Sequence, residues 1–345
     1  MHKNMTASLT GRLYGLIALS VALILTFTHL PEQAGAADIA LGFAGSLLRV
    51  GLGVAALYTT VVCLGLLLNV ATRNSRFFHK HIEVAPEVRF EPVALPTVVK
   101  ALRHEILANI KSFWYLFPWQ NRTGIVEGCP QASQARANTT PVLLVHGFMC
   151  NAGVWNTLRP HLQRRGITSH SITCNPLGGD IDDFAHMMHT AVLELQRRTG
   201  SQKVRMIGHS MGGLMIRAYV KHYGEQHIES ALCLGAPHQG TIYSLGGQGI
   251  CAKQMNLGNP WLMSMTRSKA DIAFRRKLTN ICTTLEDIVQ PASSAALPGA
   301  RNWMVSHCGH TVMPADKGII ALIDTWLEEV VLEESTQEEY AALAA

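Results

Sequence analysis

The chain has 345 residues, of which 48% are hydrophobic and 15% are charged, and its formal net charge is +5. This length suffices for one large domain with a full core and an additional segment. The modest charge, without a basic stripe interleaved with aromatic residues, argues against a nucleic-acid-binding protein. The eight cysteines show no CxxC pair or zinc-like spacing, which predicts free thiols and favours a domain that faces the cytosol.

Two apolar segments open the chain. Residues 13–30 contain no Lys, Arg, Asp or Glu, and residues 50–71 form a second, stronger segment. Each is about long enough to cross a bilayer, so residues 1–72 are predicted to form a transmembrane hairpin. The first segment also resembles a cleavable signal peptide that ends in the Ala-Gly-Ala of residues 34–36.

The distribution of basic residues predicts the orientation of this hairpin. Lys3 and Arg12 precede the first segment, Arg73, Arg76 and Lys80 follow the second, and the loop between the segments has no Lys or Arg. The positive-inside rule then places both outer flanks, and the rest of the chain, in the cytoplasm.

Residues 73–140 are predicted to be a linker that contains one amphipathic helix. Apolar residues recur at helical spacing within residues 98–119, among three basic residues. Such a helix fits a membrane surface, or it packs on the main domain. Residues 123–140 are expected to be an exposed loop.

From residue 141 to residue 345, apolar strands alternate with amphipathic helices. This order predicts an α/β domain with a mostly parallel sheet and helices on both faces. In such sheets the ligand site lies beyond the carboxyl ends of the strands. Strands are expected within residues 141–148, 169–176, 203–208, 229–237, 278–284 and 302–307, and helices within residues 180–200, 212–224 and 317–331.

The stretch Gly208-His209-Ser210-Met211-Gly212 fits the pattern GxSxG and lies between a predicted strand and a predicted helix. That context indicates a nucleophile elbow, in which a tight turn exposes the serine hydroxyl above the sheet. Ser210 is therefore the candidate nucleophile.

A serine nucleophile needs a base and an acid, expected in the chain order serine, acid, histidine. His310 is preferred as the base over His307 because it follows the last strand in a loop. Asp287 is preferred as the acid over Glu286 because Ile288 and Val289 follow it and would bury its surroundings.

The oxyanion that develops during catalysis needs backbone N–H donors. Met211 directly follows the nucleophile, and Phe148 lies in the turn after the first predicted strand of the domain, so their amides are the candidates. His146, beside that turn, is interpreted as structural. The sequence shows no metal site or dinucleotide-binding loop, and a serine hydrolase needs no cofactor.

These motifs resemble the α/β-hydrolase superfamily and, within it, bacterial lipases and esterases of the triacylglycerol lipase type. The resemblance covers about residues 140–330, and it rests on "LLVHGF", "GHSMGG", "LGAPHQGT", "LEDIVQPASSAALPGARN" and "HCGH". It implies the α/β-hydrolase fold, and it implies triad and oxyanion roles for Ser210, Asp287, His310, Phe148 and Met211. It also makes His238 a structural residue.

The predicted function is therefore a serine hydrolase of carboxylic esters in a bacterial inner membrane, which acts through an acyl-enzyme on a lipid or ester substrate. A thioesterase or acyltransferase would share the triad, and a non-catalytic membrane scaffold is the alternative from another class. Residues 241–275 form an insertion whose apolar residues either line an acyl pocket or lid, or pack as ordinary core.

Overall fold

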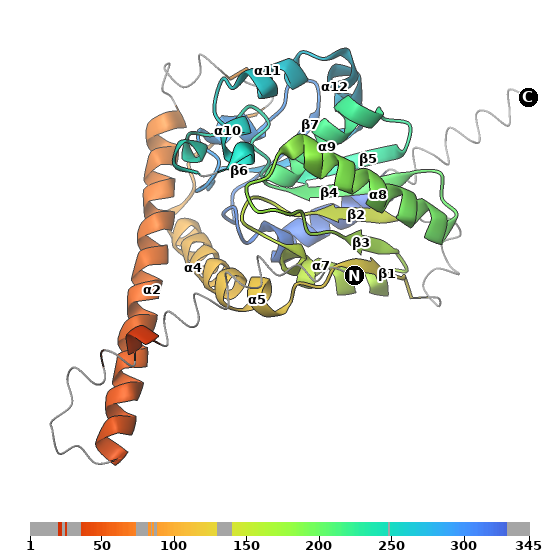
Figure 1. Cartoon of the computed structure of the whole chain (residues 1–345). Helices are drawn as coiled ribbons and strands as arrows, with labels where there is room; N and C mark the ends of the chain where they lie inside the picture. The colour runs from red at the N-terminus through yellow and green to blue at the C-terminus, as the bar shows by residue number, and fades with distance from the viewer. Residues whose placement is uncertain are drawn as a thin grey trace, which may run out of the picture.

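The computed structural model describes residues 20–22, 25, 36–73, 82–83, 85, 88–129, 140–247 and 249–329. A seven-stranded sheet in the order β1-β3-β2-β4-β5-β6-β7 forms its centre (Figure 1). All neighbouring strands are parallel except β1 and β3. The predicted mostly parallel sheet is confirmed. The strands are β1 (Gly124–Val126), β2 (Val142–Val145), β3 (Ser169–Ser171), β4 (Val204–His209), β5 (Ile228–Leu234), β6 (Leu278–Thr283) and β7 (Arg301–Val305).

Strand β1 corrects the expectation of an exposed loop over residues 123–140. It contains only three half-buried residues, and it pairs antiparallel with β3. A run this short carries no periodicity that a sequence could reveal. Residues 130–139 of the same segment lie outside the described residues.

Both faces of the sheet are buried, as the apolar runs of its strands require. In β2, Leu143 and Val145 belong to one core cluster, whereas Val142 and Leu144 belong to the other. The first cluster includes α8 (Ile181–Thr199) and α9 (Met211–Tyr223), and the second includes α7 (Leu158–Arg164) and a helix over residues 317–329. The sheet is therefore the middle layer of three. Outside the insertion after β5, the described residues include three 3₁₀ helices, η2 (Ala152–Asn156), η5 (Ala292–Ala295) and η6 (Met313–Ala315).

The insertion after β5 is packed on the domain rather than extended from it. Asp271 is 1% exposed and accepts hydrogen bonds from Arg217 of α9 and from Arg275. Trp261 donates its indole N–H to Asp182 of α8 at 2.8 Å. The insertion consists of η3 (Ile242–Gly246), α10 (Ile250–Gln254), α11 (Pro260–Thr266), α12 (Lys269–Phe274) and η4 (Arg275–Lys277).

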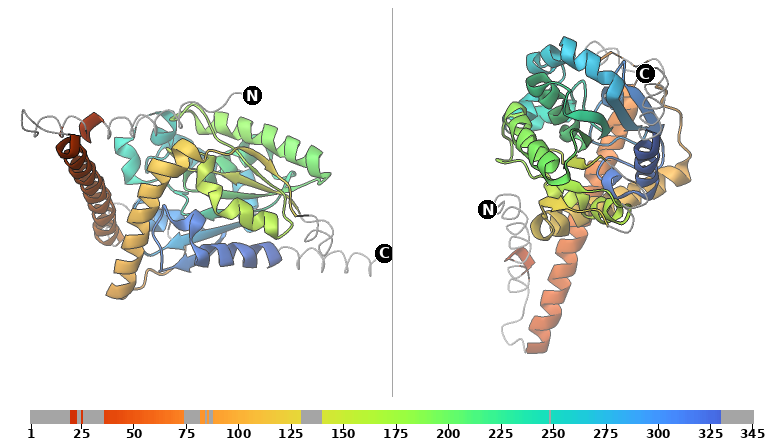
Figure 2. Two further views of the ribbon diagram at one scale, coloured as in Figure 1. Left: turned by 90° about the horizontal axis from the view of Figure 1, so that it is seen from below. Right: turned by 90° about the vertical axis from the view of Figure 1, so that its right-hand side faces the viewer.

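One long helix, α2 (Ala36–Arg73), precedes the sheet. Its stretch Ile39–Thr72 is long and apolar enough to cross a membrane, and only 11% of its most apolar window is buried. Figures 1 and 2 show that the N-terminal half of α2 projects beyond the rest of the fold. The predicted span 50–71 lies within this helix. Of the predicted span 13–30, only residues 20–22 and 25 are described, so the hairpin stays a prediction.

The predicted amphipathic helix is present as α4 (Leu95–Lys111), followed by one π-helical turn, η1 (Ser112–Leu116), and by α5 (Phe117–Trp119). Ala101, Glu105 and Asn109 of α4 are buried, at the i, i+4, i+8 spacing of one helix face. This face packs on the domain, which agrees with the second of the two interpretations of the helix. A buried glutamate at the centre of that face requires partners.

Candidate active site

Ser210 lies between β4 and α9 in a strained turn, with φ 55° and ψ −126°. A positive φ is costly for a residue with a Cβ and persists only where its surroundings enforce it. The Ser210 N–H donates to the Leu234 carbonyl of β5 at 2.8 Å, and the Ser210 carbonyl accepts from Gly213 at 3.0 Å. The turn therefore has the geometry that the GxSxG motif predicts.

Small residues are necessary around this turn because neighbouring backbone comes very close. A Cβ on Gly212 would lie 2.3 Å from the Val145 carbonyl oxygen, and a Cβ on Gly147 would lie 2.8 Å from Ser210 Cβ. The loop after β2, which continues into Phe148, thus lies directly against the serine. Met211 is the first residue of α9, where backbone N–H groups have no partner within the helix. Of the two predicted oxyanion donors, Met211 directly follows Ser210, and Phe148 directly follows Gly147, which lies against the serine.

The imidazole of His310 is buried and contacts a carboxylate. Its Nδ1 lies 2.9 Å from Oε1 and 3.2 Å from Oε2 of Glu286. Glu286 is fully buried, and its Oε1 also accepts the backbone N–H groups of Ile288 and Val289, both at 2.9 Å. The carboxylate that faces the ring is therefore fixed by its own loop.

The preference for Asp287 over Glu286 as the partner of the ring is not what the structure shows. Asp287 Oδ1 accepts the backbone N–H of His310 at 2.9 Å, so Asp287 holds the histidine backbone while Glu286 contacts the ring. The loop after β6 turns so that the first of the two acids points toward the imidazole. Both acids are buried, so burial, the criterion used on the sequence, does not distinguish them.

The electrostatics of the pair suit a general base. Burial alone would lower the pKa of His310, but the charge and hydrogen bond of Glu286, together with the charge of Glu105, raise it above 6.5. Burial and the charges of Glu105 and Glu286 raise the pKa of Asp287 well above 3.8. The surroundings of Asp287 therefore disfavour a negative charge on its carboxyl group.

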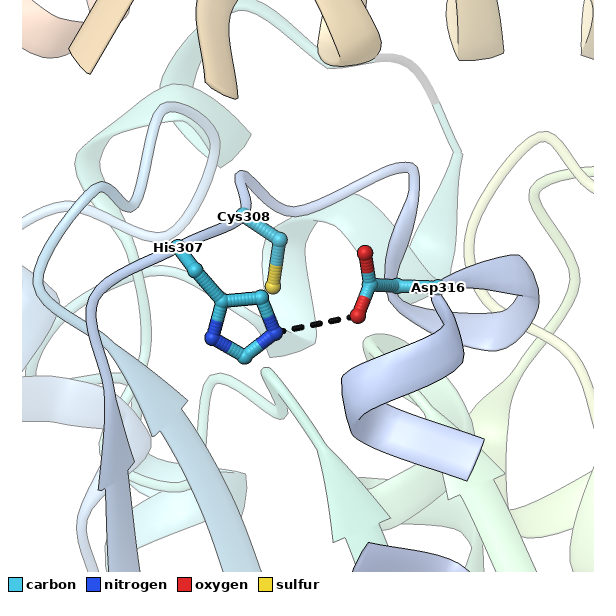
Figure 3. Close-up of side chains that lie close together, drawn as sticks. All are labelled: His307, Cys308 and Asp316. Atoms are coloured by element: carbon cyan, nitrogen blue, oxygen red, sulfur yellow. Dashed lines mark hydrogen bonds and ion pairs between the residues drawn. The ribbon is translucent and has the colours of Figure 1, made fainter. Parts of the chain in front are cut away.

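His307, the alternative base, has a different partner. Its Nε2 lies 3.0 Å from Asp316 Oδ1 at the surface (Figure 3). With Cys308 these side chains form a group that could hold a metal ion. However, Asp316 Oδ1 also accepts the N–H groups of Gly318 and Ile319, as a helix N-cap does, and burial raises the pKa of the Cys308 thiol. These contacts explain the group without a metal ion.

Two further histidines near the site have structural contacts. His146 Nε2 accepts the N–H of Cys174 at 2.9 Å, and its Nδ1 lies 2.8 Å from the Gly147 carbonyl oxygen. Burial lowers the pKa of His146 to about 4, so the ring is neutral and fixes the loop that precedes Phe148. His238 is fully buried, with Nε2 2.8 Å from Asn280 Oδ1. Neither ring is placed as the base for Ser210.

The loop after β6 that carries Glu286 and Asp287, here called the acid loop, is bound by the C-terminal end of α2, a helix that precedes the sheet. Asn69 Nδ2 donates to the carbonyls of Thr284 and Glu286 at 3.1 Å and 2.9 Å. Gln290 Nε2 donates to the Gly65 carbonyl at 3.3 Å. A Cβ on Gly65 would lie 2.1 Å from the Asp287 carbonyl oxygen. The sequence analysis missed this contact, although Gly65 and Asn69, four residues apart in an apolar segment, were a visible signal for it.

The chain was compared with protein-family models and with solved structures. A family model described as palmitoyl protein thioesterase matches residues 141–285. The mature lipase BlEst2 of Bacillus licheniformis superposes with a TM-score of 0.52 and 16% identity, over 59% of this chain and 97% of that structure. The chain has the α/β-hydrolase fold and resembles lipases and esterases. The resemblance inferred from the motifs is thereby confirmed.

Two curated relatives are bacterial lipases. The chain is 28% identical over 163 residues to the triacylglycerol lipase of Burkholderia plantarii, a match that covers 43% of this chain and 44% of the relative. It is 31% identical over 118 residues to that of Pseudarthrobacter phenanthrenivorans, which covers 31% of this chain and 36% of the relative. The matches thus span less than half of each relative.

Proposed function

We propose that the protein is a membrane-anchored serine hydrolase of carboxylic esters, with Ser210 as nucleophile, His310 as base and Glu286 as acid. The single observation that carries this proposal is the pairing of His310 Nδ1 with the Glu286 carboxylate at 2.9 Å, in a domain whose strand–turn–helix presents Ser210. The chain order of the three residues is the one expected for this fold.

In the proposed mechanism Ser210 Oγ attacks the ester carbonyl carbon while His310 Nε2 accepts the hydroxyl proton. Glu286 stabilises the imidazolium that forms, and the amides of Phe148 and Met211 bind the oxyanion. When the tetrahedral intermediate collapses, the alcohol leaves with the proton from His310 and the acyl group stays on Ser210. Water then attacks this acyl-enzyme by the same route, which releases the acid and restores the serine.

Thioester hydrolysis is the second candidate. It is favoured by the family model over residues 141–285, which is described as palmitoyl protein thioesterase. The same three residues would perform it, with a thiol in place of the alcohol as the leaving group. Parallel assays with an acyl-CoA and a p-nitrophenyl ester of the same chain length separate the two activities.

We also propose that α2 anchors the enzyme in a bacterial inner membrane with the hydrolase domain in the cytoplasm and an acyl lipid or ester as substrate. The length and apolarity of Ile39–Thr72 support the anchor. The basic residues before residue 13 and after residue 72 support the orientation.

The experiment that tests the triad is substitution of the nucleophile. Ser210→Ala is expected to lower p-nitrophenyl butyrate hydrolysis by about 10⁴-fold or more, with unchanged thermal unfolding. It is also expected to abolish labelling by a fluorophosphonate, which reacts with activated serines. Ser306→Ala, on the same domain but outside the proposed triad, is the matched control. A folded Ser210→Ala protein with near-normal hydrolysis would refute the proposal.

A further inference from the structure

Helix α4 inserts one fully buried acid behind the loop that carries His310. Glu105 is 1% exposed, and its Oε1 accepts the backbone N–H of Thr311 at 2.5 Å while its Oε2 accepts that of Val312 at 3.2 Å. Both carboxylate oxygens thus bind the two residues that directly follow His310. Burial raises the pKa of Glu105, whereas the hydrogen bonds from Thr311 and Val312 and the charge of His310 lower it.

The fit around this acid is close. A Cβ on Gly309 would lie 2.7 Å from Glu105 Oε2, so the residue before His310 must be small for the carboxylate to reach the loop. Asn109, one turn later on α4, donates to the Glu105 backbone carbonyl at 3.0 Å. Asn109 also donates to Glu105 Oε1 at 3.4 Å, so the carboxylate has a partner on its own helix.

A small cavity of about 10 Å³ lies between Glu105 and Asp287. Val62 and Leu66 of α2 also line it. Among the described residues, Asp287 Oδ2 has no hydrogen-bond partner although it is buried. Asp287 and Glu105 thus line one cavity beside the His310 loop, with the first bound to the N–H of residue 310 and the second to those of residues 311 and 312.

We infer that Glu105 is a positioning residue for His310, supplied to the active site by a helix that precedes the hydrolase sheet. The inference rests on the proposed function, because it assigns Glu105 a role through the proposed base. Three consecutive backbone N–H groups, those of residues 310, 311 and 312, are bound by two carboxyl groups. These hydrogen bonds fix the backbone of His310 and thereby the position of its imidazole. A misplacement of a catalytic group by about 1 Å costs roughly 10²-fold in rate.

The test uses the full chain in detergent, p-nitrophenyl butyrate as substrate, and Glu105→Gln. An amide of the same shape keeps one acceptor oxygen but presents an NH₂ group to a backbone N–H, and it removes the negative charge. We expect kcat to fall by about tenfold or more with KM nearly unchanged. We also expect the acid limb of the kcat/KM profile to move to lower pH, because the charge of Glu105 raises the pKa of His310.

The charged and titratable groups that face His310 are Glu286 after β6, Glu105 on α4, Asp287, and His209, whose ring centroid lies 4.9 Å from that of His310. Of these only Glu105 changes in the test variant. Arg103→Gln, an exposed position on the same helix, is the matched control and is expected to leave kcat and the pH profile unchanged.

Two results would overturn the inference. One is a Glu105→Gln enzyme with kcat within twofold of the wild type. The other is a lower kcat with an unmoved acid limb and a fall in thermal stability, which would show a structural role only. Fluorophosphonate labelling of the wild type and of Ser210→Ala, in the same preparations, tests the proposed function separately. A failure of the proposed function can therefore be distinguished from a failure of the inference about Glu105.

Discussion

The two adjacent acids of the loop after β6 are expected to respond very differently to amide substitution. Glu286→Gln replaces the carboxylate that lies 2.9 Å from His310 Nδ1. Two unit charges about 4 Å apart interact by about 4 kcal/mol at an effective dielectric constant of 20, and each 1.36 kcal/mol corresponds to a factor of ten. Loss of this stabilisation of the imidazolium predicts a fall in kcat of about 10³-fold.

Asp287→Asn is the matched comparison, because it is the same chemical change one residue later. The amide keeps an oxygen that can accept the His310 N–H, which Asp287 Oδ1 now accepts at 2.9 Å. Burial and the charges of Glu105 and Glu286 raise the pKa of Asp287, so its surroundings disfavour a negative charge at this position. We therefore expect kcat within about tenfold of the wild type. Steady-state kinetics on both variants, with circular dichroism as a check of folding, measure the contrast. The reverse order, with Asp287→Asn the crippling change, would refute the assignment.

Three further predictions concern the base, the helix and the membrane. Because Glu286 raises the pKa of His310, kcat/KM is expected to fall as the pH drops through a value above 6.5, and Glu286→Gln should move that limb to lower pH; an unmoved limb would contradict the pairing. Asn69→Ala leaves two buried carbonyls of the acid loop without their donor and should lower the free energy of unfolding by about 1–3 kcal/mol. Leu67→Ala, at an exposed position, should leave it unchanged. Equal effects of the two variants in denaturant titrations would argue against the contact. Reporter fusions after Ala345 should give fluorescent green fluorescent protein and inactive alkaline phosphatase, and the opposite pattern would place the domain outside the cytoplasm.

The sheet and the elbow were predictable because their signals are local. Apolar runs alternate with amphipathic helices, and the second helix of the domain begins after Asp180 and ends at Gly200 as its capping residues indicate. At Ser210 the flanking strand, the small residues and the helix lie within one short stretch. Strand β1 was missed because three residues without alternation contain no such signal.

The choice between two adjacent acids depends on the path of a turn rather than on residue type. Glu286 and Asp287 are both carboxylates, both follow β6, and both are buried, so sequence reasoning had only their apolar neighbours as a criterion. The turn is fixed by partners more than 200 residues away, since Asn69 of α2 binds the carbonyls on either side of Leu285.

The long sequence separation between these helices and their partner loops also explains why the sequence predicted α2 only as an anchor and α4 only as an amphipathic helix. One buried polar residue of each helix binds backbone of the loops after β6 and β7. Asn69 of α2 binds the carbonyls of residues 284 and 286, and Glu105 of α4 binds the N–H groups of residues 311 and 312. An unpaired polar group costs free energy in a bilayer and in a protein core alike. Isolated polar residues within such helices therefore indicate a specific partner, and here both partners are the loops that carry Glu286 and His310. The helix that we propose as the anchor thus also packs against the loop that carries Glu286, so a version of the protein that begins at residue 141 would lack this contact.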